Sequence, residues 1–143
     1  MISLRVLGSN GWYSTNEADT VCILIETDNY YVVLDAGGGI SRLDEYIKDD
    51  KPIYLVLSHF HLDHVAGLHV LGKFRFSQGM TIFGQPGTKK ILKTLVNHPF
   101  TIPLEHLAYK VTVQELTEGD NTFPDVAIPI ETGYLVHADP CFG

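Results

Sequence analysis

Hydrophobic positions along the chain form runs typical of strands, separated by segments with helical spacing. The strand-like runs are rich in Val, Ile, Leu and Tyr, and they cover residues 3–8, 20–27, 30–37, 53–58, 80–84 and 109–116. Residues 40–50 and 86–98 carry apolar side chains at helical spacing, and a short helical segment is expected just after residue 64. Residues 126–139 are mostly extended, with Pro129 placing part of them at a sheet edge or bulge. Strands interleaved with helices predict an α/β domain.

Two features of this pattern predict how the sheet is built. Asp28 and Asn29 lie between two strand-like runs and predict a tight hairpin, so the flanking strands pair antiparallel. Residues 53–58 are a continuous apolar run, as is typical of a strand buried on both faces. We therefore expect a mixed sheet with 53–58 in its interior and helices on one face.

Composition narrows the class of protein. The chain has 143 residues, of which 45% are hydrophobic and 19% charged, which indicates a globular domain that can bury its own core. No apolar run approaches the roughly 18–20 residues of a membrane span, and the first residues lack the basic region of a signal peptide. The two cysteines, Cys22 and Cys141, do not form a disulfide framework, so we expect a cytoplasmic protein with no membrane partner.

The charge distribution is uneven. The net charge of −7 argues against nucleic-acid binding through the whole surface, although it leaves a nucleic-acid substrate open. No acidic residue lies between His64 and Glu105, and this stretch holds half of the basic side chains: Lys73, Arg75, Lys89, Lys90 and Lys93. Two interpretations remain: a solvated helix face, or a positive rim beside a site that takes an anionic substrate.

The sequence SHFHLDH, directly after the buried run 53–58, carries the candidate chemistry. In extended geometry alternate residues point the same way. This predicts that His59, His61 and Asp63 converge on one point, while the intervening Phe and Leu face the core. His64, where the chain turns, reaches a neighbouring point.

Imidazole and carboxylate together suit zinc, or manganese and iron with more oxygen ligands. Two adjacent binding points predict two divalent metal ions that share a bridging hydroxide.

This sequence resembles the HxHxDH signature of the metallo-β-lactamase superfamily. The segment VVLDAGGG resembles the family's strand that ends in Asp-x-Gly, here with Asp35. The segment LVHADPCFG resembles the part of the ribonuclease Z and phosphodiesterase-like branches that carries the next metal-binding histidine, here His137. The alternatives are a turn residue for Asp35 and a strand histidine without metal for His137.

The resemblance implies an αββα sandwich, of which this chain covers the first sheet with its helices and the start of the second half. The implied metal ligands are His59, His61 and His137 for the first ion, and Asp63 and His64 for the second. Asp63 would also orient or deprotonate the attacking water as the catalytic residue. Asp35 would hydrogen-bond to a ligand histidine and fix its orientation.

The implied function is a metal-dependent hydrolase of a phosphodiester or another anionic ester, acting on a small-molecule or nucleotide-like substrate. Ribonuclease Z itself is less favoured, because DAGGG lacks the acidic, Gln-containing continuation expected there. One alternative is a metallo-hydrolase of a thioester, lactone, sulfate ester or β-lactam. The other is a catalytically incomplete metal-binding fragment or subunit.

The resemblance also bears on the domain boundary. A bridging aspartate and a last histidine ligand are expected beyond Gly143, so residues 1–143 are expected to be one domain truncated at its C-terminus. The sheet face that the second half would cover is then expected to pack against another copy of the chain or against a second fragment.

Other candidates receive a structural interpretation. His69, His98 and His106 are expected to be solvated or structural, and Cys141 to be a small buried hydrophobe. The loop around Trp12 either borders the mouth of the site or is a plain turn.

Overall fold

A six-stranded mixed sheet forms the centre of the computed structural model, which describes residues 1–143. Its strands, adjacent in chain order, are β1 (Ser3–Gly8), β2 (Cys22–Glu26), β3 (Tyr31–Leu34), β4 (Ile53–Val56), β5 (Met80–Gly84) and β6 (Val111–Glu115). The first three strands are antiparallel, and β3 to β6 are parallel. The mixed α/β sheet is as predicted, with β4 in its interior and the hairpin between β2 and β3.

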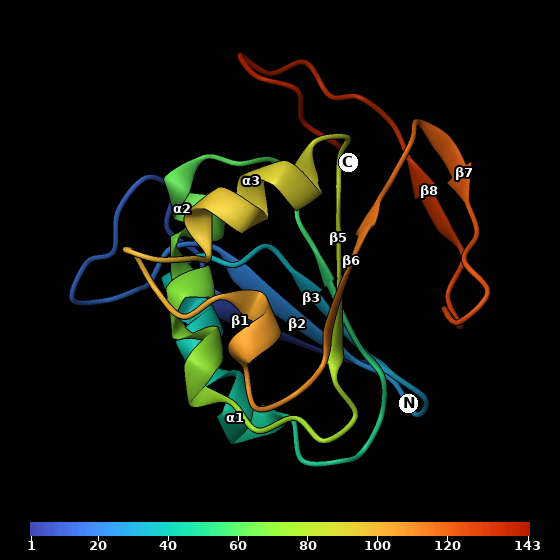
Figure 1. Cartoon of the computed structure of the whole chain (residues 1–143), viewed down its shortest axis with the longest axis horizontal. Coiled ribbons are helices and arrows are strands. Elements are labelled where there is room, and N and C mark those ends of the chain that lie inside the picture. Colours follow the sequence, from blue (N-terminus) through green and yellow to red (C-terminus); the bar gives the residue numbers. More distant parts are fainter.

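All the helices lie on one face of this sheet (Figure 1). They are the 3-10 helices η1 (Gly38–Arg42), η2 (Ala66–Lys73) and η3 (Leu104–His106), and the α-helices α1 (Leu43–Tyr46), α2 (Leu62–Val65) and α3 (Thr88–Leu95). None of them is long and apolar enough to cross a membrane.

Two helices are shorter than the sequence pattern predicts. The segment predicted as a helix over 40–50 is a 3-10 turn followed by one α-helical turn, and Ile47 is already extended. The residues after it lead into Pro52, which disfavours helical backbone just before it. The helix predicted over 86–98 starts only after Gly87, whose φ of 96° is outside the helical range.

A small antiparallel ribbon, β7 (Gly119–Asn121) and β8 (Ile130–Thr132), lies on the other side of the sheet (Figure 1). Three residues of the segment 126–139 pair as a strand, and most of the rest is irregular.

The two faces of the sheet are packed unequally. Ile53 and Leu55 belong to a cluster of 22 buried hydrophobic residues between the sheet and the helices. Tyr54 belongs to a cluster of four buried residues on the opposite face, where the ribbon lies. On the same face as Tyr54, Leu4 and Val6 on β1 remain 62% and 56% exposed. The face away from the helices is therefore partly uncovered.

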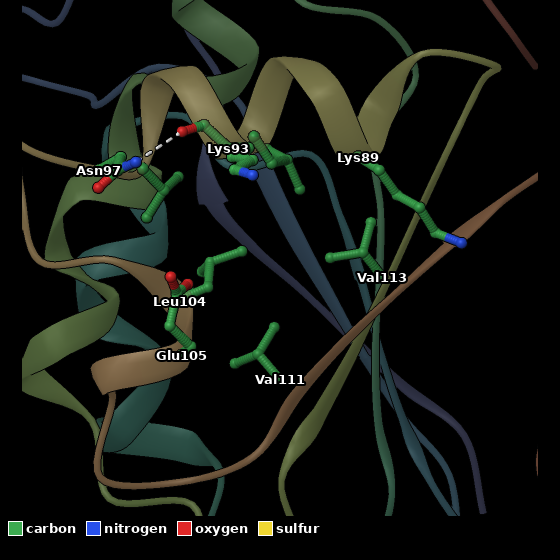
Figure 2. A pocket seen from close by; sticks show the side chains of 9 residues that line it. Lys89, Lys93, Asn97, Leu104, Glu105, Val111 and Val113 are labelled. Carbon is green, nitrogen blue, oxygen red and sulfur yellow. Dashed lines mark hydrogen bonds between the residues drawn. The ribbon is translucent and has the colours of Figure 1, made fainter.

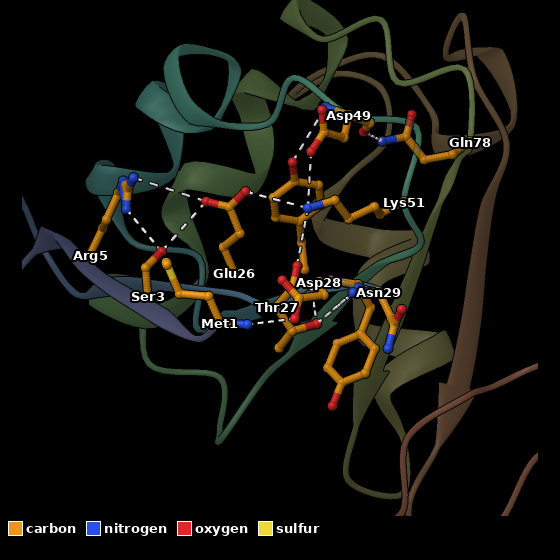
Figure 3. A network of polar contacts seen from close by, with 12 residues as sticks. Met1, Ser3, Arg5, Glu26, Thr27, Asp28, Asn29, Asp49, Lys51 and Gln78 are labelled. Atoms are coloured by element: carbon orange, nitrogen blue, oxygen red, sulfur yellow. Dashed lines mark hydrogen bonds and ion pairs between the residues drawn. The ribbon is translucent and has the colours of Figure 1, made fainter.

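The amino ends of the parallel strands are held by a polar network (Figure 3). Lys51 Nζ lies 3.4 Å from Glu26 Oε1 and 3.0 Å from Asp49 Oδ2, and it donates to the Thr27 carbonyl oxygen at 3.0 Å. These contacts join the β2–β3 hairpin to the segment that enters β4. They lie at the end of the sheet opposite the histidine-rich segment.

Candidate metal centre

The candidate site lies where the parallel strands β3 and β4 end. Asp35 directly follows β3, and His59 comes three residues after β4. The Asp35 amide donates to the Val56 carbonyl oxygen at 2.9 Å, so the two strand ends are in register. Because carboxyl ends of parallel strands meet at the same edge of a sheet, the side chains that follow them are brought together.

Three histidines from two distant segments form the centre of this site. His59, His61 and His137 each present one ring nitrogen within 4.8 Å of the others. His59 is buried, with 4% of its surface exposed, whereas the other two face solvent. Three imidazole nitrogens converging on one point match a zinc site that keeps a position open for water or substrate. The donor set therefore fits a divalent metal ion.

Asp63 and His64 lie beside this cluster. Asp63 Oδ2 is 3.6 Å from His64 Nε2 and accepts a hydrogen bond from the Trp12 amide at 2.7 Å. The His64 ring centroid is 4.0 Å from that of His59. The arrangement offers a carboxylate and an imidazole that could hold a second ion next to the first.

The predicted alternation through this segment is wrong after His61. α2 begins at Leu62, so Asp63 is on a helix rather than on the extended segment with His59. Leu62 is 67% exposed instead of facing the core, whereas Phe60 is half-buried and packs against the core. The reason is that the side-chain period changes from 2 to 3.6 where the helix starts.

Asp35 is buried behind the histidines and accepts several hydrogen bonds. Its carboxylate accepts from the Ser58 amide at 2.8 Å and from Ser58 Oγ, and it lies 2.8 Å from His64 Nδ1. Ser58 Oγ is also 2.9 Å from His59 Nδ1. Asp35 thus contacts one histidine directly and another through Ser58, which leaves the Nε2 atoms of both rings for other partners.

The backbone after Asp35 packs closely against the segment that carries His64 and Gly67. The Ala36 amide donates to the His64 carbonyl oxygen at 2.7 Å, and the Gly67 amide donates to the Ala36 carbonyl oxygen at 2.8 Å. A Cβ atom on Gly67 would overlap the Gly37 carbonyl oxygen. Small residues are therefore required where this segment meets the helix that carries His64.

The sequence analysis missed Asp139 and the backbone of Trp12. Asp139 Oδ2 lies 2.8 Å from His61 Nε2. The only sequence signal for it is its position two residues after His137. The Trp12 amide reaches Asp63, so the loop that carries it borders the site rather than forming an independent turn.

Comparisons with known proteins bear on the fold and the family of the chain. The family model described as the metallo-beta-lactamase superfamily matches residues 15–76. The short form of human tRNase Z superimposes with a TM-score of 0.76 at 20% identity, over 99% of this chain and 63% of that one. A diphosphatase from the PhnP family superimposes with a TM-score of 0.71 at 17% identity, over 100% of this chain and 61% of that one. The chain belongs to the metallo-β-lactamase superfamily.

Among curated members of the superfamily, a ribonuclease Z from Macrococcus caseolyticus is 30% identical over 147 residues, which cover 96% of this chain and 46% of that protein. The chain spans about half the length of the curated relatives it matches.

The surroundings of the superfamily motif favour a neutral His59 and an ionised Asp63. Burial, followed by the positive charges of the neighbouring histidines, holds the pKa of His59 below its ordinary value. Burial opposes ionisation of Asp63, but the Trp12 amide and His64 outweigh it, and the pKa of this carboxyl is lowered. Neutral imidazole and carboxylate are the forms that bind metal.

Cys141 lies next to His59, on the side of its Nδ1 atom. Its Sγ atom is 3.8 Å from His59 Nδ1, and the side chain is buried as expected. The histidines outside the motif, His69, His98 and His106, are exposed.

The basic residues of the acid-free stretch do not form one rim. Lys89 and Lys93 line a cavity of about 360 Å³ between α3 and β6, together with Glu105 (Figure 2). Lys73 pairs with Asp44 at 2.8 Å. Lys90 borders a groove that also contains Phe60, next to His61 in the sequence. Arg75 donates to the carbonyl oxygens of Gly72 and Phe74. Of the five basic residues, Lys90 alone lines a groove with a residue of the histidine-rich segment.

Proposed function

We propose that this chain carries the metal centre of a hydrolase that cleaves phosphodiesters with two divalent metal ions, zinc being the best match. The observation that carries the proposal is the convergence of His59, His61 and His137, with ligand atoms within 4.8 Å of one another. Asp63 and His64, at 3.6 Å from each other, supply the second pair of ligands.

The metal ions would supply Lewis-acid activation of a water molecule and of the ester, and the chain's own residues prepare the site for it. Asp63 is held in place by the Trp12 amide and is kept ionised, so it can orient the attacking water or accept its proton. Asp35 keeps the His64 ring turned with Nδ1 away from the centre. Ser58 does the same for His59.

The names of the relatives support a phosphodiester substrate. Curated relatives are called ribonuclease Z or ribonuclease BN, and one structural neighbour is called a diphosphatase. The sequence alone made ribonuclease Z the less favoured activity, and these names argue against that ranking. We therefore propose RNA as a substrate as well as small nucleotide-like esters. Cys22 and Cys141 are unpaired thiols, which supports a reducing, cytoplasmic location.

Metal binding is the direct test, because it does not depend on turnover. The metal content of the purified chain is measured by elemental analysis, and zinc is titrated back after removal with a chelator. We expect the wild-type chain to bind zinc at the three histidines, with partial occupancy as purified. The variant His59→Ala loses the one buried imidazole of the cluster, and we expect binding to the first position to be lost.

His106→Ala is the matched control, because it removes an exposed imidazole on η3, away from the motif. Its zinc content should equal that of the wild type. Unchanged zinc stoichiometry in His59→Ala would refute the proposed site. We expect the loaded wild-type chain to hydrolyse bis(p-nitrophenyl) phosphate weakly at most. Any turnover that His59→Ala lacks would connect the metal site with the phosphodiester substrate.

A further inference from the structure

Asp139 contacts two of the three clustered histidines at once. Its Oδ2 atom is 2.8 Å from His61 Nε2. Its backbone lies against His137, with the Asp139 amide 3.2 Å and its carbonyl oxygen 3.3 Å from His137 Nδ1. The rings of His61 and His137 have centroids 4.9 Å apart. One residue therefore ties together ligands that are far apart in the sequence.

The bond to Asp139 decides which nitrogen of His61 remains for a metal. A carboxylate only accepts hydrogen bonds, so the hydrogen of the ring must be on Nε2. A neutral imidazole with its hydrogen on Nε2 has its free lone pair on Nδ1.

We propose that Asp139 is a positioning residue that makes His61 present Nδ1 to the metal, and that holds His137 beside it. The proposal rests on the proposed function for the presence of the metal.

The neighbouring histidines are held in the opposite orientation. His64 and His59 are bonded through Nδ1, to Asp35 and Ser58 respectively, at 2.8 and 2.9 Å. Their Nε2 atoms are left for metals. His61 is turned the other way because its partner binds Nε2. Each ring is thus held by a different group, bonded to the nitrogen that does not face the metal. Hydrogen bonds of this kind set the ring orientation in metal sites.

The contact between His61 and Asp139 contributes little to the fold itself. The side chains are 46% and 64% exposed, and exposed ion pairs add little to stability. The segment that carries Asp139 is held by its backbone instead, because the Phe142 amide donates to the Ser58 carbonyl oxygen at 3.0 Å. Removing the carboxylate should therefore change metal binding and leave folding intact.

A cobalt(II) titration followed by visible absorption tests the proposal on the metal-free chain and its variants. We expect Asp139→Ala to bind cobalt about 10–100-fold more weakly than the wild type. Asp139→Asn should recover most of the affinity, because its amide oxygen still accepts from Nε2–H. Asp125→Ala, which removes an exposed carboxylate elsewhere, should bind as the wild type does. The midpoint of thermal unfolding of the metal-free proteins should be the same in all four.

Long-range ¹H–¹⁵N correlation spectra of the histidine rings give an independent result without metal. The His61 signals, assigned with His61→Ala, should show the hydrogen on Nε2 in the wild type and a mixture of both tautomers in Asp139→Ala.

Equal cobalt affinity of Asp139→Ala and the wild type would overturn the proposal, as would a hydrogen on Nδ1 of His61 in the wild type. Asp139→Asn as weak as Asp139→Ala, with an altered cobalt spectrum, would make Asp139 a direct ligand and also overturn it. A wild-type chain that binds no cobalt would refute the proposed function, while the tautomer measurement would still decide the role of Asp139.

Discussion

Replacing Asp35 should weaken both the fold and the metal centre. Asp35 is 8% exposed, and its carboxylate accepts from the amide and hydroxyl of Ser58 and contacts His64 Nδ1. Asp35 also has a φ of 59°, in the left-handed region that Asp, Asn and Gly tolerate better than other residues. The side chain and the backbone of this residue therefore make separate contributions, and different substitutions can measure them.

The magnitudes follow from these contacts. Asp35→Ala leaves the Ser58 amide without an acceptor, which costs about 1–3 kcal/mol. Alanine in the left-handed region adds about 1 kcal/mol, so the free energy of unfolding should fall by about 2–4 kcal/mol. Asp35→Gly removes the same acceptor without backbone strain and should be about 1 kcal/mol more stable than the alanine variant. Asp35→Asn keeps the shape and one acceptor, and should lose about 1–2 kcal/mol.

Urea unfolding of the metal-free variants measures these differences, and a zinc competition titration measures the metal affinity. We expect zinc affinity to fall about 10–100-fold in the alanine variant, because His64 and, through Ser58, His59 lose their orienting partner. An alanine variant that matches the wild type within about 0.5 kcal/mol, with unchanged zinc affinity, would refute the reasoning. Glycine and alanine variants of equal stability would show that the left-handed backbone carries no strain.

Three further outcomes are expected. Gly67→Ala should lose about 1–3 kcal/mol of stability in urea unfolding, because its Cβ would overlap the Gly37 carbonyl oxygen, whereas Gly133→Ala, with open space around it, should be neutral. Burial raises the pKa of the Cys22 thiol to about 12, so it stays protonated at pH 8 and should react with a thiol reagent only after unfolding. Fast labelling of Cys22 in the native chain would contradict this. Light scattering should show the isolated 143-residue chain as an oligomer, and Val6→Lys on the uncovered sheet face should shift it towards the 15.9 kDa monomer. A wild-type monomer would argue against association through this face.

The sequence by itself determined the sheet and most of the candidate ligands. Residues 3–8 and 80–84 are strands with the predicted bounds, because period-2 patterns and closing glycines act within a few residues. The cluster of histidines after β4 is also a local signal, since a buried strand must end at the edge where its next residues meet those after β3. His137 was found through resemblance rather than spacing.

Only the tertiary structure decided how these groups are arranged. α2 starts at Leu62, which places Asp63 on a helix, and this helix packs so closely that a Cβ on Gly37 would overlap the Asp63 carbonyl oxygen. The contacts of Asp63 with Trp12 and of His61 with Asp139 join residues that are 51 and 78 positions apart. Hydrophobic periodicity reports which face of an element is buried, and it carries no information on which distant polar group will lie opposite. The orientation of each imidazole is therefore set by folding, although the imidazoles themselves are visible in the sequence.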